Sequence, residues 1–167
     1  MFIFLDYIGV YGPVLTTALT FVTLLNRYYY LIAFIGGTIV NVYMNGVLKD
    51  YFREPRPPGQ IPFNNETLKG IHVYGFPSGH SQIASFAFAF LYWANGPPAV
   101  LYSMFFIWFL TLYQRWKYRR HTIKQLFFGA VFGVFVAWFS VYFTKRAILT
   151  VDLERSSPLF LFRPLKI

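Results

Sequence analysis

Long apolar runs, separated by short charged or proline-containing stretches, constrain this chain more than any other feature of its sequence. The runs cover residues 8–25, 31–48, 81–94, 99–113 and 121–143. The longest of them approach the roughly 20 apolar residues that an α-helix needs to cross a bilayer. Because a backbone inside lipid must satisfy its own hydrogen bonds, each run is predicted to be a helix. We therefore expect an all-α fold, a polytopic transmembrane helical bundle with about five membrane helices.

The composition is typical of a single integral membrane domain over residues 1–167. Hydrophobic residues make up 56% of the chain and charged residues only 13%, whereas soluble domains carry roughly 25% charged residues. The chain has no cysteine, which excludes a disulfide, a thiolate metal site and a cysteine nucleophile. The net charge of +9 comes largely from basic residues near the ends of the apolar runs. This pattern favours membrane topology and an anionic ligand over a nucleic-acid partner.

The basic residues converge on one side of the predicted membrane domain. Counting one crossing for each run places residues 49–57, 77–80 and 115–121 on the same face. A charge at the centre of a membrane helix costs about 2.5–3.5 kcal/mol, so charges are expected at helix ends, but not on one face only. The basic residues favour a cytosolic position for this face, whereas a glycosylation sequon at Asn65 favours a lumenal one in a eukaryotic membrane.

The stretch Gly-Phe-Pro-Ser-Gly-His at residues 75–80 lies on that face, where a polar loop ends and an apolar run begins. Ser78 is a preferred helix N-cap, and Gly79 lets a ligand approach the backbone of the first turn. The free N–H groups of such a turn, at the positive end of the helix dipole, bind oxyanions. His80 adds a group that titrates near neutral pH. Taken alone, the stretch is better explained as an ordinary helix cap.

Two further stretches on the same face complete a three-part signature. Lys49 is followed after six residues by Arg56-Pro57, and Arg115 is followed after five residues by His121 and after three more by Gln125. Together with Pro-Ser-Gly-His, these stretches resemble the signature of the type-2 phosphatidic acid phosphatase and haloperoxidase superfamily. Most of that family has aspartate where this chain has Gln125. The glutamine and the strings Arg-Glu-Pro-Arg-Pro and His-Thr-Ile-Lys-Gln are most similar to the dolichyl diphosphatase branch.

The resemblance implies a role for each matching residue. His121 would be the nucleophile that forms a phosphohistidine, and His80 the general acid that protonates the leaving oxygen. Gln125, with a carbonyl that can accept a hydrogen bond from Nδ1–H, is expected to orient His121 from one helical turn further along the chain. The nearby cations are expected to keep His121 neutral and nucleophilic. The phosphoryl oxygens would be bound by Lys49, Arg56, Ser78, Gly79 and Arg115.

Three functions are compatible with such a site. The first is a membrane lipid phosphatase that hydrolyses a polyprenyl (dolichyl-type) diphosphate. The second is a phosphatidic acid phosphatase of broad lipid specificity, and the third a non-catalytic membrane protein that binds anionic lipid. The sequence contains no carboxylate cluster or metal-binding motif, so we expect no metal and no cofactor. In a eukaryotic cell the protein is expected in the endoplasmic reticulum membrane.

The remaining charged residues are expected to have structural roles. Glu54 should pair with neighbouring arginines, and His72 should be a solvated loop residue. Lys145 and Arg146 should mark the opposite membrane interface. Four further basic residues are expected to face lipid headgroups, two of them (Arg53 and Arg119) within reach of a second phosphate group: Arg53, Lys117, Arg119 and Arg120.

Overall fold

The chain folds into a bundle of α-helices. A computed structural model describes residues 3–63 and 73–156. These residues form five helices and no strand, which confirms the predicted all-α class. The helices are α1 (Ile3–Leu24), α2 (Tyr28–Phe52), α3 (Gly79–Trp93), α4 (Pro98–Lys117) and α5 (Ile123–Ser156). The sequon at Asn65 and the loop residue His72 lie outside the described residues, so both predictions stay open.

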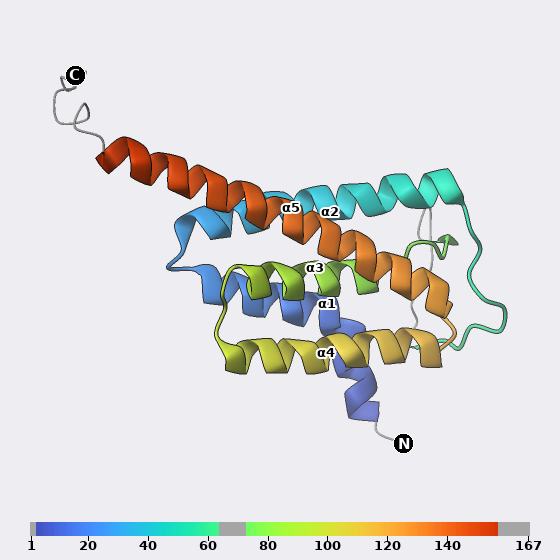
Figure 1. The fold of residues 1–167 in the computed structure, drawn as a ribbon. Coiled ribbons are helices and arrows are strands. Elements are labelled where there is room, and N and C mark those ends of the chain that lie inside the picture. Colours follow the sequence, from blue (N-terminus) through green and yellow to red (C-terminus); the bar gives the residue numbers. More distant parts are fainter. Residues whose placement is uncertain (1–2, 64–72, 157–167) are drawn as a thin grey trace.

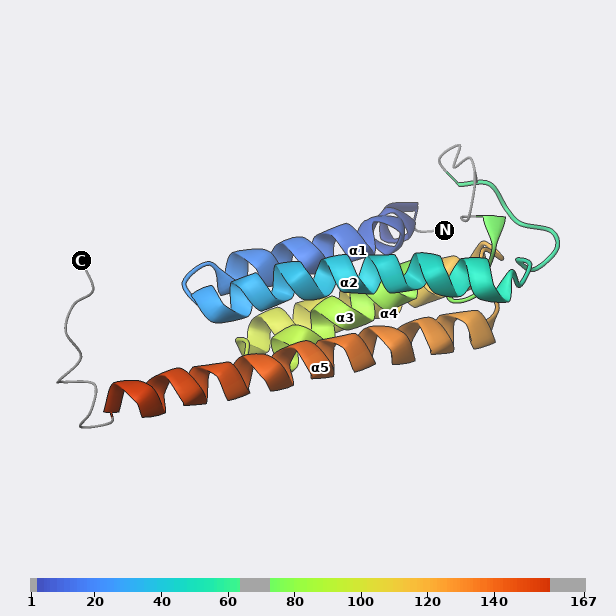
Figure 2. The same ribbon diagram turned by 90° about the horizontal axis from the view of Figure 1, so that it is seen from above.

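Successive helices run in opposite directions along the bundle (Figure 1). The C-terminal ends of α2 and α4 and the N-terminal ends of α3 and α5 therefore meet at one end of the molecule. Because α3 lies in the middle, it packs against each of the other four helices (Figure 2). All three parts of the signature lie at the same end, as the count of crossings predicted.

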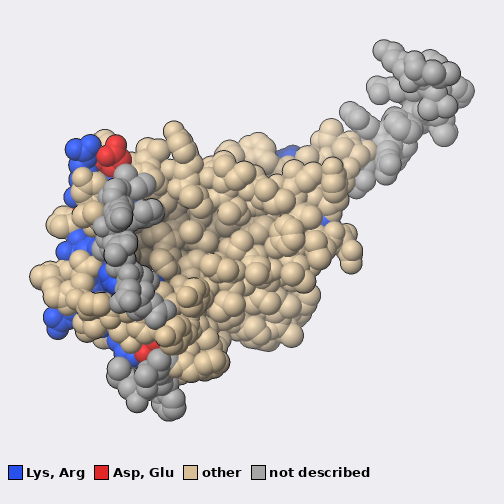
Figure 3. Space-filling model, turned by 180° about the vertical axis from the view of Figure 1, so that it is seen from behind, with Lys and Arg blue, Asp and Glu red and all other residues tan. Residues whose placement is uncertain are grey.

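The surface is that of a membrane protein. By length and composition, α1, α2 and α5 are apolar enough to cross a membrane. In contrast, α3 has only 15 residues, and most of its side chains are buried among the neighbouring helices. On the face drawn in Figure 3, Lys and Arg side chains gather at one end and the body of the bundle is almost uncharged. The chain is thus an integral, multi-pass membrane protein with one charged end.

Several helices extend further than the apolar runs. Lys49 lies within the last turn of α2, and Arg115 within the last turn of α4. Near the C-terminus, α5 continues past Lys145 and Arg146 to Ser156, so these two residues do not end the helix. The reason is that hydropathy marks the part of a helix suited to lipid, whereas charged residues are compatible with further helical turns outside it.

Two glycines on α5 allow it to approach α3 closely. A Cβ atom on Gly129 would lie 2.5 Å from the carbonyl oxygen of Ser78, and one on Gly133 would lie 2.1 Å from that of Gln82. A spacing of four residues places both glycines on one face of the helix, the small-residue arrangement by which membrane helices pack. The start of α3 is thereby held directly against α5.

The interior changes from apolar to polar towards the charged end. In the apolar part, the Phe34 ring stacks on Phe86 with centroids 5.5 Å apart and meets Phe90 edge-on at 5.2 Å. These aromatic rings are buried and form part of the hydrophobic core.

Nearer the site, buried amides replace the aromatic rings. Gln82 Nε2 donates to Asn41 Oδ1 at 2.9 Å, and Asn45 Nδ2 donates to Gln82 Oε1 at 2.7 Å. Asn41, Asn45 and Lys49 follow one another at four-residue spacing on the buried face of α2. Because buried amides need partners, this network fixes the position of α3 relative to α2.

Candidate active site

Helix α3 begins at the predicted cap. The Oγ atom of Ser78 accepts a hydrogen bond from the backbone N–H of Ser81 at 3.4 Å. The backbone N–H of Ser78 donates to the carbonyl of Gln125 at 3.0 Å. A Cβ atom on Gly79 would lie 3.1 Å from Asn45 Oδ1, so a side chain at this position would require the Asn45 amide to shift by a few tenths of an ångström. The expected anion-binding turn is therefore held between α2 and α5.

Two predicted phosphate-binding cations lie beside this turn. Lys49 is only 2% exposed, and its Nζ atom donates to the backbone carbonyl of Tyr74 at 2.9 Å. Arg56 Nη1 donates to the carbonyl of Arg120 at 2.9 Å and lies 3.3 Å from Nε2 of His121. The first part of the signature is thus in direct contact with the predicted nucleophile.

The turn after α4 brings Arg115 and His121 together. Arg119 adopts a left-handed backbone conformation with φ of 49°. Its N–H donates to the carbonyl of Trp116 at 3.0 Å, and the N–H of Arg120 donates to that of Arg115 at 2.9 Å. These are the two hydrogen bonds of a Schellman motif, with arginine in the position that usually holds glycine. The N–H of His121 also donates to the Arg115 carbonyl, at 3.3 Å.

The contacts of the His121 ring define its tautomer. Nδ1 lies 2.9 Å from the backbone carbonyl oxygen of Gly75 and 3.3 Å from Oε1 of Gln125. Because both oxygens accept hydrogen bonds, Nδ1 carries the proton and the ring lone pair is on Nε2. Burial lowers the pKa of His121 well below its ordinary value, and the positive charges of Arg56 and Lys49 lower that pKa further. The imidazole is therefore neutral, and its unprotonated nitrogen is the one beside Arg56.

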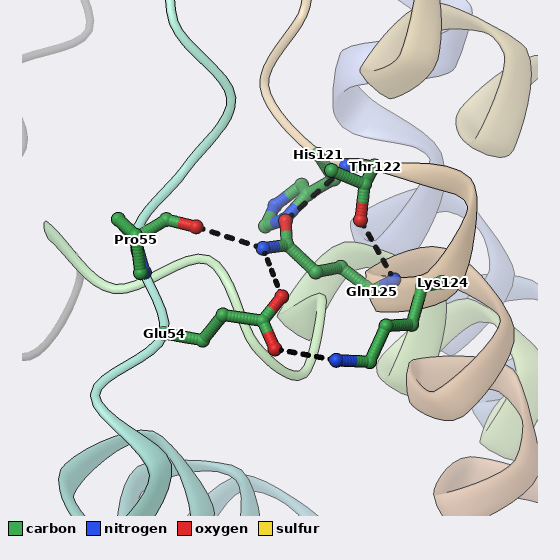
Figure 4. Close-up of polar contacts among 6 residues, drawn as sticks. All are labelled: Glu54, Pro55, His121, Thr122, Lys124 and Gln125. Carbon is green, nitrogen blue, oxygen red and sulfur yellow. Dashed lines mark hydrogen bonds and ion pairs between the residues drawn. The ribbon is translucent and has the colours of Figure 1, made fainter.

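Gln125 contacts His121 as predicted, but for a different geometric reason. His121 precedes α5, which begins at Ile123, so the two residues are not on successive turns of one helix. Instead, Thr122 Oγ1 accepts from the Gln125 N–H, and Gln125 Oε1 accepts from the Thr122 N–H, both at 3.2 Å (Figure 4). This reciprocal pair is a capping box, for which the sequence pattern Thr-x-x-Gln is a recognised signal. The capping box turns the glutamine amide back towards the imidazole.

His80 lies in the first turn of α3 and is partly buried. It is near the backbone of Val10 in α1 and lies within the field of Arg115, Arg56 and Lys49. His80 also contributes to the electrostatic environment of His121. The two histidines of the signature are therefore in one charged site.

Several charged residues have other partners than expected. Lys117 does not face lipid headgroups, because its Nζ atom donates to both carboxylate oxygens of buried Asp6 at 2.7 Å. Arg120 is also buried, with its Nη1 3.4 Å from Oε1 of Gln60. The expectation that these two residues lie at the lipid interface was wrong. Arg53 is exposed and pairs with Asp50.

Glu54 was expected to pair with arginines, and this prediction was also wrong. Its Oε2 pairs with Lys124 at 2.9 Å, and its Oε1 accepts a hydrogen bond from Gln125 Nε2 at 2.9 Å. Sequence reasoning had no signal for this contact, because the residues are some seventy positions apart. Among the described residues, no group of three or more His, Cys, Asp or Glu side chains is arranged to hold a metal ion.

Comparison with known proteins identifies the family. The model of the PAP2 superfamily matches residues 28–149. The chain belongs to the PAP2 superfamily. The matched range contains every residue of the three-part signature, so the family inferred from those motifs is confirmed.

Curated relatives within the PAP2 superfamily are dolichyldiphosphatases. Dolichyldiphosphatase 1 of Mus musculus is 33% identical over 141 residues, covering 72% of this chain and 57% of that protein. Dolichyldiphosphatase 1 of Homo sapiens is 32% identical over 139 residues, covering 71% and 56%. Dolichyldiphosphatase of Saccharomyces cerevisiae is 30% identical over 96 residues, covering 57% and 32%. The chain therefore spans less than two thirds of the length of these relatives, and no solved structure matches it significantly.

Proposed function

We propose that this protein is a membrane lipid phosphatase that hydrolyses a polyprenyl (dolichyl-type) diphosphate through a phosphohistidine intermediate. The observation that carries the proposal is the orientation of His121, with Nδ1 bound to carbonyl oxygens and Nε2 beside Arg56. Membership in the PAP2 superfamily supports the phosphatase chemistry. The similarity to dolichyldiphosphatases supports the substrate class.

The reaction has two balanced steps. In the first, the Nε2 lone pair of His121 attacks the terminal phosphorus, and the bond from that phosphorus to the bridging oxygen breaks. In the free protein, burial and the charges of Arg115 and Arg56 lower the pKa of His80 to about 3, so His80 takes up its proton only when the negative charge of the bound diphosphate offsets those cations. The lipid phosphate then leaves with that proton. In the second step, water attacks the phosphorus of the phosphohistidine, His80 takes a proton from the water, and the N–P bond breaks. Inorganic phosphate is released, and both histidines return to their initial protonation states.

Arg56 has two roles in this scheme. Before substrate binds, its Nη1 lies 3.3 Å from Nε2, where it donates to the lone pair that must attack. A phosphoryl oxygen is a stronger acceptor for a guanidinium than a neutral imidazole. Substrate binding therefore draws Arg56 away from Nε2, so that the nucleophile becomes available only when the phosphate is present.

The other predicted phosphate-binding residues, which with Arg56 form the phosphate cradle, act by positioning and charge: Lys49, Ser78, Gly79 and Arg115. Lys49 and Arg115 are both buried, so their positive charges act in a low-dielectric environment. Ser78 and the Gly79 N–H add hydrogen-bond donors at the start of α3. Phosphoryl transfer depends mainly on such preorganised groups. Loss of one donor typically costs about 10²–10³ in kcat.

The position of the site suits a lipid substrate. The charged end of the bundle adjoins an almost uncharged surface (Figure 3). A lipid can therefore place its diphosphate among the cations while its chain remains in the membrane. In a eukaryotic cell we expect this membrane to be the endoplasmic reticulum, and loss of a glycosylation mobility shift in Asn65→Gln would identify the active face as lumenal.

The proposal is tested with a panel of lipid phosphates in detergent micelles. Dolichyl diphosphate, dolichyl phosphate and phosphatidic acid are compared for phosphate release by wild type and His121→Ala. We expect the diphosphate to react fastest, the activity to survive EDTA, and His121→Ala to be inactive. Faster release from phosphatidic acid would favour a broad lipid phosphatase. If neither protein released phosphate but both bound anionic lipid, the non-catalytic alternative would stand.

A further inference from the structure

A chain of hydrogen bonds connects His121, the candidate nucleophile, to the carboxylate of Glu54. Glu54 follows α2 in the chain, and its side chain is 30% exposed. One carboxylate oxygen accepts from Gln125 Nε2, and the other pairs with Lys124 (Figure 4). Gln125 Oε1 in turn faces Nδ1 of His121 at 3.3 Å. A single amide group therefore separates the carboxylate from the imidazole that would become cationic during phosphoryl transfer.

The hydrogen bonds of the Gln125 amide determine its orientation. Its Nε2 donates to Glu54 Oε1 and to the backbone carbonyl of Pro55, both at 2.9 Å. Its Oε1 faces two donors, the Thr122 N–H and the His121 Nδ1–H. A rotation of the Gln125 amide by 180° would turn its NH₂ group towards two donors and its carbonyl towards two acceptors. The buried amide would then lose its hydrogen bonds, which is unfavourable. Glu54 therefore helps to keep the carbonyl, rather than the NH₂ group, towards His121.

We propose that Glu54 is a positioning residue for His121, acting through Gln125 on both the orientation and the charge of the imidazole. Hydrogen bonds to an ionised partner are roughly twice as strong as neutral ones, and they polarise the next bond in a chain. When the Glu54 carboxylate accepts a hydrogen bond from Gln125 Nε2, it polarises the amide and makes Gln125 Oε1 a better acceptor for a cationic imidazole. Where most of the family would have an aspartate in place of Gln125, this chain divides the task between a glutamine and a remote glutamate. The inference rests on the proposed phosphatase function for its kinetic test.

The charges around these residues favour this role. The charged groups that lower the pKa of His121 are Arg56, Lys49, His80 and Arg115, whereas Glu54 is linked to the ring only through the Gln125 amide. Burial raises the pKa of the Glu54 carboxyl, but hydrogen bonds from Lys124 and Gln125 outweigh this effect and hold that pKa below its ordinary value. Glu54 is therefore ionised at neutral pH, and its negative charge lies beside basic groups of the site that the structure describes, Arg56, Lys49 and Arg115.

The test compares Glu54→Gln with Glu54→Ala. Glutamine keeps an acceptor for Gln125 but removes the charge, whereas alanine removes both. We expect kcat to fall about 5- to 10-fold in Glu54→Gln and about 10- to 100-fold in Glu54→Ala. KM should change little, because the partners of the Glu54 carboxylate in the described part of the chain are Lys124 and Gln125, neither of which is a predicted phosphate-binding group.

Two matched variants separate this role from general effects of charge or structure. Asp50→Asn removes an exposed carboxylate that pairs with Arg53 at the same end of the molecule, and it should leave kcat unchanged. Lys124→Met removes the other partner of Glu54 without touching Gln125, and its effect should be smaller than that of Glu54→Gln. A loss in either variant as large as that in Glu54→Gln would overturn the inference.

A spectroscopic measurement tests the inference without turnover. In the free protein, ¹⁵N NMR of selectively labelled histidine should show His121 protonated at Nδ1 in wild type and Glu54→Gln. In Glu54→Ala the Nδ1–H tautomer should remain, because the Gly75 carbonyl still accepts from Nδ1, but the Nδ1 chemical shift should change as the Gln125 amide loses its carboxylate partner. An unchanged spectrum in Glu54→Ala, together with wild-type kcat, would refute a positioning role for Glu54. If His121→Ala were active while the Nδ1 shift depended on Glu54, the proposed function would fail and the contact would stand.

Discussion

Replacing Gly129 with alanine should displace the start of α3 and reduce activity while the fold is retained. The new Cβ atom would lie 2.5 Å from the Ser78 carbonyl oxygen, whereas ordinary contacts begin at 3.4 Å. The two helices must therefore separate by about 0.9 Å at this point, the kind of overpacking that costs about 1–3 kcal/mol of stability. Ser78 is hydrogen-bonded to the backbone of Gln125, so this separation moves the phosphate cradle away from His121.

The expected effect on activity is larger than the effect on stability. A displacement of about 1 Å in a catalytic site can reduce the rate by about 10²-fold. We therefore expect a loss of about 10- to 100-fold in kcat/KM for phosphate release from dolichyl diphosphate, with weaker binding of vanadate as a phosphate analogue. Thermal unfolding in the same detergent should show that the variant remains folded.

Gly36→Ala is the matched control. A Cβ atom on Gly36 meets nothing within 4 Å, so the same substitution adds only helix propensity, at most about 1 kcal/mol. Its kcat/KM should equal that of wild type. If Gly129→Ala kept activity within about threefold of Gly36→Ala, close packing of α5 on Ser78 could not be what positions the cradle.

Three further predictions concern protonation, orientation and stability. Because His121 is held neutral while an unfolded histidine titrates near pH 6.5, the unfolded state binds the extra proton at acid pH. His121 alone should therefore lower the unfolding free energy by up to about 1.4 kcal/mol per pH unit between pH 6.5 and 5, and His80, with its pKa lowered to about 3, should add a similar slope. His121→Asn should reduce this slope, and an identical slope in denaturant titrations would contradict the assignment. Gln125→Leu should lower kcat about 10- to 100-fold with little change in KM, and unchanged turnover would exclude an orienting role. Asp6→Asn leaves Lys117 without its buried carboxylate partner and should cost about 3 kcal/mol of stability, measured by chemical denaturation, while activity per folded molecule stays near wild type.

The number of helices and the end at which the motifs meet were predictable because both depend on local properties of the chain. An apolar run long enough to cross a bilayer must be helical, and each crossing reverses the direction of the chain. Lys49, His80 and Arg115 were therefore assigned to one face without knowledge of any contact between them. Helix ends were less predictable, since charged residues such as Lys145 can continue a helix beyond the apolar segment.

The turn at Arg119 shows why local prediction was incomplete. Arg119 adopts a left-handed backbone conformation. An arginine does not predict this conformation, because such positions are usually predicted from a glycine in the sequence. The capping box formed by Thr122 and Gln125 did have a local signal. The glutamine was instead assigned to the same helix face as His121, and the contact was predicted with an incorrect geometry.

The sequence by itself determined the all-α class, the position of the basic residues at helix ends and the family signature, because these follow from residue type and spacing along the chain. Only the tertiary structure decided how His121 is oriented. Its closest hydrogen-bond partner is the backbone carbonyl of Gly75, a group that every residue possesses and that no sequence pattern identifies. Likewise, Glu54 could not be assigned to Gln125 from the sequence, since that contact depends on the packing of α2 and α5 at one end of the bundle. Hydrogen-bond partners such as these are determined by proximity in the folded structure. They strongly affect the orientation of a buried histidine, because burial leaves it few other groups with which to form hydrogen bonds.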